Sequence, residues 1–372
     1  MKSSWKKVQL QDICTKGSSN IAQNKIEDNF GDYPLYGASG FLKNIDFYHQ
    51  ERPYIGVVKD GSGVGRVGFY PGKSSLLGTL QYILPKEGYD IRFVGYVLKS
   101  LNLSSFTTGA AIPHIYFRDY GKSVIKVPQT IEEQKRIVAE LDLLSEVIEK
   151  KNQQLRDLDK LAESIFFELF GDPSFNDKKW PVKYISDLFD VGSSKRVFES
   201  EWRDSGVPFY RAREIVRLSK GEPLEDPIFI EEALFAEYKQ RYGVPKAGDI
   251  MVTGVGTLGI CYLVKESDRF YFKDGNTLWF KSKGLCNTRF IKDLYSTDYI
   301  KEQIKANAHG ATVGTYTIVN AKNTRVIVPP IEIQNDYVEK VLKIDAQKEL
   351  INESLKQTQQ LLDSRMDYYF NE

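Results

Sequence analysis

Two glycine-rich stretches of this 372-residue chain have the residue spacing of a nucleotide-binding motif. GVGRVG, from Gly63 to Gly68, and GVGTLG, from Gly254 to Gly259, both fit the pattern G-x-G-x-x-G. That pattern binds a dinucleotide pyrophosphate when it follows a strand and opens a helix. Here FYPGKSS follows the first stretch, and the strand-like ICYLV follows the second. Both stretches therefore predict β-hairpins, in which glycine supplies positive φ or lets another backbone come close.

Residues for other kinds of catalysis are few. The chain has no G-x-S-x-G sequence, and GFYPGKS is one residue too short for a phosphate-binding loop. Its three histidines and three cysteines are dispersed, with no C-x-x-C pair, which disfavours a zinc site or a disulfide framework. The Asn-Pro-Pro-aromatic sequence of amino-methyltransferases is also missing. We therefore expect a non-catalytic chain with no metal and no cofactor of its own.

The same motifs occur twice in the same order, which indicates an internal repeat. WKKVQLQDI near the start resembles WPVKYISDL in the middle, and YPLYGASG resembles VPFYRARE. The two glycine stretches follow, and then TTGAAIPHI matches AHGATVGTYTI, and VIKVPQTIEEQ matches RVIVPPIEIQ. From Gln134 and Gln334 onward, the two copies keep a constant offset of 200 residues.

Each copy ends with the pattern of a long helix. From Ile137 to Leu169, apolar residues recur at alternating steps of four and three, as in the seam of a coiled coil. The same steps run from Tyr337 to Tyr369, but this seam is weakened at Lys348, Thr358 and Arg365. A long helix with one apolar stripe needs a partner, so we expect the two helices to pair. The alternative is that each helix packs separately on its own domain.

The segments before the helices are rich in β-strand patterns and are punctuated by glycine and proline. A short helix is predicted at IRFVGYVLKSL. The expected organisation is a first domain at 1–129, its helix at 130–170, a second domain at 171–329 and its helix at 330–372. No run is apolar enough to span a membrane, and the N-terminus lacks an apolar signal core, so we expect a cytoplasmic protein.

The net charge of the whole chain is +1, but basic and acidic segments alternate along it. Residues 1–128 carry a net charge of +6 and residues 171–329 carry +3, whereas the helical segments 129–170 and 330–372 each carry −4. Basic domains gain affinity for DNA by neutralising phosphates, and acidic helices suit protein partners better than DNA. The alternative is ordinary variation of the surface.

This layout resembles the specificity subunit of type I restriction–modification systems. The resemblance covers nearly the whole chain and rests on Trp5, Trp180, YPLYGASG, the glycine hairpins, TTGAAIPHI, VPQTIEEQKRI with VPPIEIQ, and LFGDP. It implies an α+β fold with a pseudo-two-fold repeat, in which two target-recognition domains are joined by an antiparallel coiled coil. Each domain would read one half of a bipartite double-stranded DNA site. The helices would set the spacing and dock two methyltransferase subunits that use S-adenosylmethionine, and a motor-nuclease subunit can join them.

Candidate DNA-contacting residues are polar side chains beside the glycine-rich loops, where side chains or backbone can reach base edges. In the first domain they are Lys59, Ser62, Arg66, Thr107, Thr108 and His114, with Tyr36 and Ser39 as weaker candidates. In the second domain they are Arg211, Arg213, Thr253, Thr257, His309, Thr312 and Thr315. Arginine can make paired hydrogen bonds to guanine, while threonine and serine are less selective. The alternative for each position is a solvated loop, and for Tyr36 a place in the core.

Two other functions fit parts of the sequence. One is a two-lobed protein scaffold that does not bind DNA, which salt-dependent DNA binding would exclude. The other is a stand-alone nucleotide-using enzyme, which depends on the two glycine stretches and would be excluded if calorimetry detects no nucleotide binding.

Overall fold

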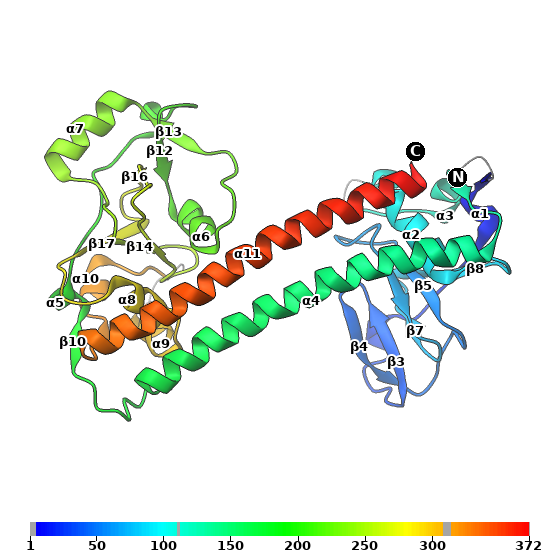
Figure 1. Ribbon diagram of the computed structural model, residues 1–372, viewed down its shortest axis with the longest axis horizontal. Helices are drawn as coiled ribbons and strands as arrows, with labels where there is room; N and C mark the ends of the chain where they lie inside the picture. The colour runs from blue at the N-terminus through cyan, green and yellow to red at the C-terminus, as the bar shows by residue number, and fades with distance from the viewer. Residues whose placement is uncertain (1–4, 110–111, 308–313, 372) are drawn as a thin grey trace. The chain divides into compact units, whose positions relative to one another are not determined.

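The chain builds two matching series of secondary-structure elements (Figure 1). The computed structural model describes residues 5–109, 112–307 and 314–371. The main elements of the first series are β1 (Lys6–Gln9), α1 (Leu10–Ile13), β2 (Cys14–Ser18), β3 (Tyr33–Gly37), β4 (Gly40–Ile45), β5 (Tyr54–Val58), β6 (Val67–Tyr70), β7 (Ser75–Leu76), β8 (Leu80–Pro85), α2 (Ile91–Ser100), α3 (Phe117–Tyr120), β9 (Val124–Val127) and α4 (Ile131–Phe170). Those of the second are β10 (Val182–Tyr184), α5 (Ile185–Leu188), β11 (Phe189–Gly192), β12 (Val207–Tyr210), α6 (Ala212–Lys220), β13 (Ile228–Ile230), α7 (Glu232–Tyr242), β14 (Ile250–Thr253), β15 (Cys261–Leu263), β16 (Tyr271–Phe272), β17 (Thr277–Ser282), α8 (Thr288–Leu294), α9 (Asp298–Asn307), α10 (Ile318–Lys322), β18 (Arg325–Ile327) and α11 (Ile331–Phe370).

The strands of the two series pair in the same way. The first forms sheets of order β2-β8-β5-β6, β4-β3-β7 and β1-β9, and the second forms β11-β17-β14-β15, β13-β12-β16 and β10-β18. Even the parallel pairing is repeated, between β3 and β7 and between β12 and β16. The repeat predicted from the sequence is therefore present in the topology of the sheets.

The chain divides into two units that each contain a globular part and a portion of both long helices. The first unit comprises Met1–Leu155 with Leu350–Glu372, and the second comprises Arg156–Glu349. Within the described ranges, no helix combines the length and the apolar character needed to cross a membrane.

A short helix packs on the main sheet of each unit. In the first unit α2 is the helix predicted at IRFVGYVLKSL, and it begins where the Asp90 carboxylate accepts hydrogen bonds from the backbone nitrogens of Arg92 and Phe93. Phe93 is completely buried in the core formed with β5 and β8. In the second unit the equivalent helix is α8, which begins at the cap residue Asn287 and buries Phe290. Burial of such a phenylalanine stabilises the fold by about 1.5–3 kcal/mol.

Within each unit, the portions of α4 and α11 lie side by side in antiparallel orientation (Figure 1). α4 ends at Phe170, where Gly171 adopts a φ of 73° and its N–H bonds to the carbonyl of Phe167. The polar positions that weaken the second seam all have partners on α4: Lys348 pairs with Asp159, Thr358 with Lys151, and Arg365 with Glu140. The order of these partners runs backward along α4, as antiparallel pairing requires.

Candidate nucleic-acid interface

Both glycine-rich stretches form the predicted hairpins. GVGRVG connects β5 to β6, and GVGTLG connects β14 to β15, so each runs into a strand and not a helix. Gly65 has a φ of 88°, and a Cβ there would lie 2.7 Å from the backbone nitrogen of Ser104. A Cβ on Gly254 would lie 3.0 Å from the backbone oxygen of Tyr316. The glycines therefore allow a second segment to approach each hairpin, at Ser104 in the first unit and at Tyr316 in the second.

In the first unit, backbone hydrogen bonds join the hairpin to the loop that contains TTGAAIPHI. The N–H of Ile115 donates to the carbonyl of Lys59, and the N–H of Gly61 donates to the carbonyl of Pro113, each at 3.0 Å. The side chains of Asp60 and His114 are hydrogen-bonded across the same junction. The structure thus brings both groups of predicted first-domain residues to one end of the sheet.

The candidate side chains at this junction differ in exposure. Ser62, Arg66 and Thr108 are exposed, and the guanidinium of Arg66 donates a long hydrogen bond of 3.4 Å to the carbonyl of Gly63. Lys59 is partly buried, with its ammonium 3.8 Å from the Asp60 carboxylate. The exposed group is therefore positioned for contact with a ligand.

The threonines of the second loop also shape its backbone. Thr107 donates its hydroxyl to the carbonyl of Ser104 at 2.6 Å, and Thr108 donates to the carbonyl of His114 at 3.3 Å. These local bonds stabilise the turn, so Thr107 has a structural role whether or not it contacts DNA.

The two weaker candidates lie on the other sheet of this unit. Ser39 is exposed in the turn between β3 and β4. Tyr36 is partly buried, and its ring centroid lies 4.9 Å from that of Tyr70. Tyr36 packs against the core formed by this sheet, which agrees with the alternative prediction that it belongs to the core.

Sequence reasoning missed two residues beside His114. The ring of Tyr116 is exposed and lies 4.1 Å from the His114 ring. The guanidinium of Arg118 lies 4.6 Å from the centroid of Tyr116. An exposed aromatic ring beside an imidazole and an arginine is a candidate for contact with a base. The signal was the sequence HIYFR, in which polar and aromatic residues directly follow the selected loop.

In the second unit, the hairpin candidates separate into one exposed and one buried residue. Thr257 is exposed at the turn. Thr253 is completely buried, and its hydroxyl donates to the carbonyl of Thr257 and accepts from the N–H of Ile260. Thr253 was predicted to contact DNA. Its side chain is instead buried at the end of β14, where it stabilises the hairpin and is not accessible to a ligand.

The second loop of this unit reaches its hairpin through Tyr316. The N–H of Tyr316 donates to the carbonyl of Gly254 at 2.9 Å, which corresponds to the Ile115–Lys59 bond of the first unit. The neighbouring Thr315 is exposed. His309 and Thr312 lie outside the described residues.

The buried phenol of Tyr316 anchors this loop through hydrogen bonds to two other side chains. Its oxygen lies 3.1 Å from the hydroxyl of Tyr295 and 2.6 Å from that of Thr324. Burial raises the pKa of Tyr316 to about 12. The phenol therefore stays neutral at physiological pH and can both donate and accept in this network.

Arg211 and Arg213 both bind the buried carboxylate of Glu214. The nearest contacts are 2.8 Å from Arg211 and 2.5 Å from Arg213. Burial alone would raise the pKa of Glu214, but the hydrogen bonds from the two arginines outweigh it and lower that pKa. The Arg211 side chain is only 23% exposed, whereas that of Arg213 is 54% exposed. Arg213 is thus better placed to meet DNA, and Arg211 mainly neutralises Glu214.

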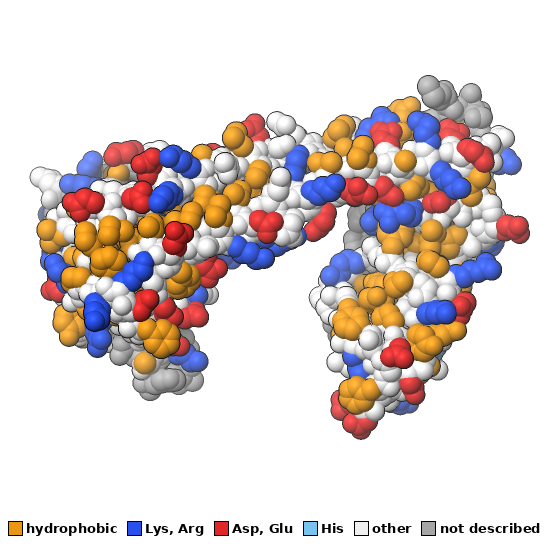
Figure 2. All heavy atoms as spheres, turned by 60° about the horizontal axis from the view of Figure 1, so that its bottom comes forward, with side chains coloured by type: hydrophobic (Ala, Val, Ile, Leu, Met, Phe, Trp, Pro, Cys, Tyr) orange, Lys and Arg blue, Asp and Glu red, His pale blue; other side chains and the backbone are white. Residues whose placement is uncertain are grey.

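Charges of both signs are interspersed on the surface shown in Figure 2. Across the described ranges, no group of three or more His, Cys, Asp or Glu side chains is arranged to hold a metal ion. The two units share one arrangement: a glycine-rich hairpin and a second loop are joined by a backbone hydrogen bond at the end of a sheet, and polar side chains are exposed beside them.

Comparison with known proteins assigns this architecture to a family. The family model described as "Type I restriction modification DNA specificity domain" matches the chain twice, at residues 2–158 and 177–360. A Haemophilus influenzae protein assigned as a type I restriction enzyme specificity subunit is 24% identical over 91% of this chain and 87% of its own length. A type I restriction enzyme specificity subunit of Methanocaldococcus jannaschii is also 24% identical, over 67% of this chain and 61% of its own.

Solved structures share the fold. The S subunit of a type I restriction–modification system from M. genitalium aligns over 98% of this chain and 96% of its own, with a TM-score of 0.61 and 16% identity. A chain from a structure of type I restriction–modification complex assembly aligns over 98% of this chain and 97% of its own, with a TM-score of 0.53 and 15% identity. These likenesses agree with the resemblance predicted from the sequence.

Proposed function

Because the chain belongs to the DNA specificity family of type I restriction–modification systems, we propose that it selects the DNA sequence on which such a complex acts. Each globular part reads one half of a bipartite double-stranded site. The observation that supports this most directly is the repeated junction of hairpin and loop, made by Ile115 with Lys59 and by Tyr316 with Gly254. Two similar readers on one chain suit a site with two halves.

We assign the two target-recognition domains to residues 1–129 and 171–329, and the spacing helices to 130–170 and 330–372. In the first domain, the reading surface comprises the exposed hairpin and second loop, with Arg66 as an exposed cation. In the second domain it comprises Thr257, Thr315 and the exposed guanidinium of Arg213.

The chemistry belongs to partners in this proposal. Two methyltransferase subunits that use S-adenosylmethionine dock on the helices, and a motor-nuclease subunit can join them. This chain contributes sequence selection and no catalytic step. Support comes from the acidic character of both helical segments, each with a net charge of −4, which disfavours direct contact with DNA.

Mapping of methylated adenines across the source genome tests this function. Deletion of the gene should remove methylation from one bipartite motif, and restoration of the gene should return it. If the methylation pattern is the same with and without the gene, the scaffold function replaces the proposed one. Purified chain without partners should neither methylate nor cut DNA.

A further inference from the structure

Two buried glutamines form equivalent contacts at the start of the two long helices. Gln134 and Gln334 each expose only 1% of their surface. The side-chain oxygen of Gln134 accepts a hydrogen bond from the backbone N–H of Asp90 at 2.9 Å. The side-chain oxygen of Gln334 accepts one from the N–H of Asn287, also at 2.9 Å. Asp90 and Asn287 are the cap residues of α2 and α8.

The amide groups of the same glutamines bind backbone carbonyls. Nε2 of Gln134 donates to Gly88, in the loop that leads into α2, at 3.3 Å. Nε2 of Gln334 donates to Pro329, just before α11, at 2.6 Å. A buried amide with both ends satisfied fixes its backbone partners in one geometry, because loss of either bond leaves a desolvated polar group.

In the first unit, a second contact attaches α2 to α4 further along both helices. Arg92, two residues after the cap, donates to the carboxylate of Asp142 through Nε at 3.0 Å. The hydroxyl of Tyr96 donates to the same carboxylate at 2.6 Å. Asp142 lies about 12 Å beyond Gln134 along α4, at 1.5 Å per residue. One attachment would leave α2 free to pivot, whereas two attachments define its direction.

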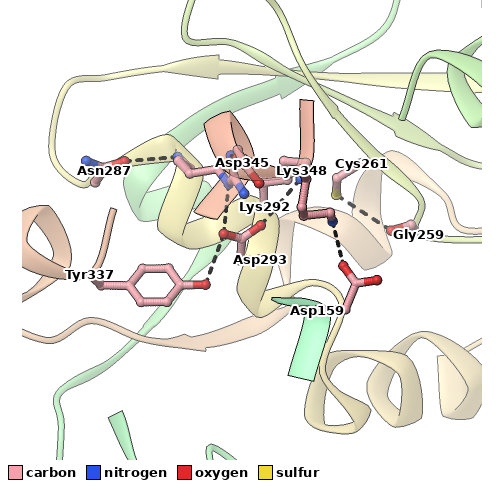
Figure 3. A network of polar contacts seen from close by, with 10 residues as sticks. Asp159, Gly259, Cys261, Asn287, Lys292, Asp293, Tyr337, Asp345 and Lys348 are labelled. Atoms are coloured by element: carbon pink, nitrogen blue, oxygen red, sulfur yellow. Dashed lines mark hydrogen bonds and ion pairs between the residues drawn. The ribbon is translucent and has the colours of Figure 1, made fainter. Parts of the chain in front are cut away.

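In the second unit, an ion pair and a tyrosine hydroxyl supply the second attachment between α8 and α11, and Figure 3 labels Asp293, Tyr337 and Asp345 of this network. Arg289, again two residues after the cap, pairs with Asp345 of α11 at 2.6 Å and with Asp293 of its own helix at 2.8 Å. Tyr337 of α11 donates its hydroxyl to Asp293 at 3.0 Å. Position 145, which corresponds to Asp345 at the 200-residue offset, is a serine. The contact of the glutamine with the cap residue is therefore the same in both units, whereas the ion pair uses aspartates at different positions, Asp142 and Asp345.

We propose that Gln134 and Gln334 are positioning residues that set the direction in which each recognition domain leaves the helix pair. This inference rests on the proposed function, because direction matters there for the distance between half-sites. A shift of about 3 Å at the reading surface corresponds to about one base pair of B-DNA. Gln134 therefore sets the tolerated spacer without touching DNA.

Spin labels on α2 and α4 measure the attachment directly in the full chain. Lys99→Cys and Lys150→Cys supply exposed labelling positions on these helices, while the three native cysteines are buried. Gln134→Met should broaden or displace the distance distribution between the labels. Gln334→Met, in the other unit, and Gln154→Met, at an exposed position of α4, are matched controls and should leave that distribution unchanged. An unchanged distribution in Gln134→Met overturns the proposal.

A second variant covers the case in which Gln134→Met does not fold. Gln134→Glu keeps the acceptor for Asp90, but as a carboxylate it has no donor for the carbonyl of Gly88, so it should also broaden or displace the distribution. If only this variant folds, an unchanged distribution in it overturns the proposal in the same way.

The assembled complex then tests the consequence for DNA. A library that varies spacer length between fixed half-sites should show additional accepted lengths for Gln134→Met, with both half-site sequences retained. Displaced labels with an unchanged spacer preference would refute the role in spacing. If the unmodified complex selects no bipartite site at all, the proposed function fails, while the label distances still decide whether Gln134 sets the direction of α2.

Discussion

The ammonium group of Lys151 on α4 lies 2.6 Å from the hydroxyl oxygen of Thr358 on α11. It also donates to the carbonyl and the hydroxyl oxygen of Ser354, at 3.0 and 2.8 Å. Lys151 occupies a seam position where the heptad pattern places apolar residues. A polar group in a coiled-coil seam lowers stability and favours one register of the helices.

Replacement of this polar layer should stabilise the first unit. In the triple variant Lys151→Leu, Ser354→Ala, Thr358→Leu, no buried polar partner is left unpaired, so the free energy of unfolding in urea should rise by about 1–3 kcal/mol. Lys348→Leu is the control, because its partner Asp159 is 63% exposed and should lose little. A less stable triple variant would show that the polar layer itself contributes net stability.

The Glu214 carboxylate should make stability depend on pH in the acidic range. Its folded pKa is lowered by the hydrogen bonds from Arg211 and Arg213, which outweigh its burial. The contribution is therefore fully present above the unfolded pKa of about 4.3 and is lost as pH falls through the folded pKa. Glu214→Gln should lower the unfolding free energy at pH 7 by about 1–3 kcal/mol.

Urea unfolding of the wild type and of Glu214→Gln between pH 7 and pH 3 measures this difference. The gap between them should close toward the acidic end. Glu237→Gln serves as the control, because the ion pair of Glu237 with Arg241 lies on the exposed surface of α7 and contributes little to stability. A gap that stays constant with pH would rule out an ionised Glu214 as the cause.

Arg66→Ala should weaken recognition in the first half-site alone. Its guanidinium is exposed beside the junction of hairpin and loop. Loss of a base contact costs about 1–3 kcal/mol and relaxes one position, whereas loss of a phosphate contact weakens binding to all sequences and lowers the salt slope by about one. Lys86→Ala is the control, because Lys86 follows the opposite end of β8 from the hairpin. Equal loss of information in both half-sites would contradict the assignment of one reader to each unit.

Lengthening of both helices should lengthen the preferred spacer. The contacts of Lys151 with Thr358 and of Asp159 with Lys348 place Leu155 roughly opposite Asn352. Four residues inserted after each of these positions add about 6 Å and form a stutter that a coiled coil absorbs by local unwinding. The complex should then prefer a spacer longer by about one or two base pairs, as binding to a library of spacer lengths would reveal. Full activity at the original spacer would exclude the helices as the ruler.

The sequence by itself determined the repeat, the long helices and the hairpins. These features arise from local patterns: seven-residue periodicity between Ile137 and Leu169, and glycines placed where a strand must turn back. The offset of 200 residues between Gln134 and Gln334 was also visible, but the hydrogen bonds that give these glutamines a role were not.

Only the tertiary structure decided which side chains are available to a ligand. Thr253 and Thr257 belong to the same hairpin motif, yet packing of β14 buries the first and exposes the second. The junction of Ile115 with Lys59 joins segments that are far apart in the chain. Burial and such long-range hydrogen bonds depend on how the strands and loops pack around a common core, and local sequence patterns do not specify that packing.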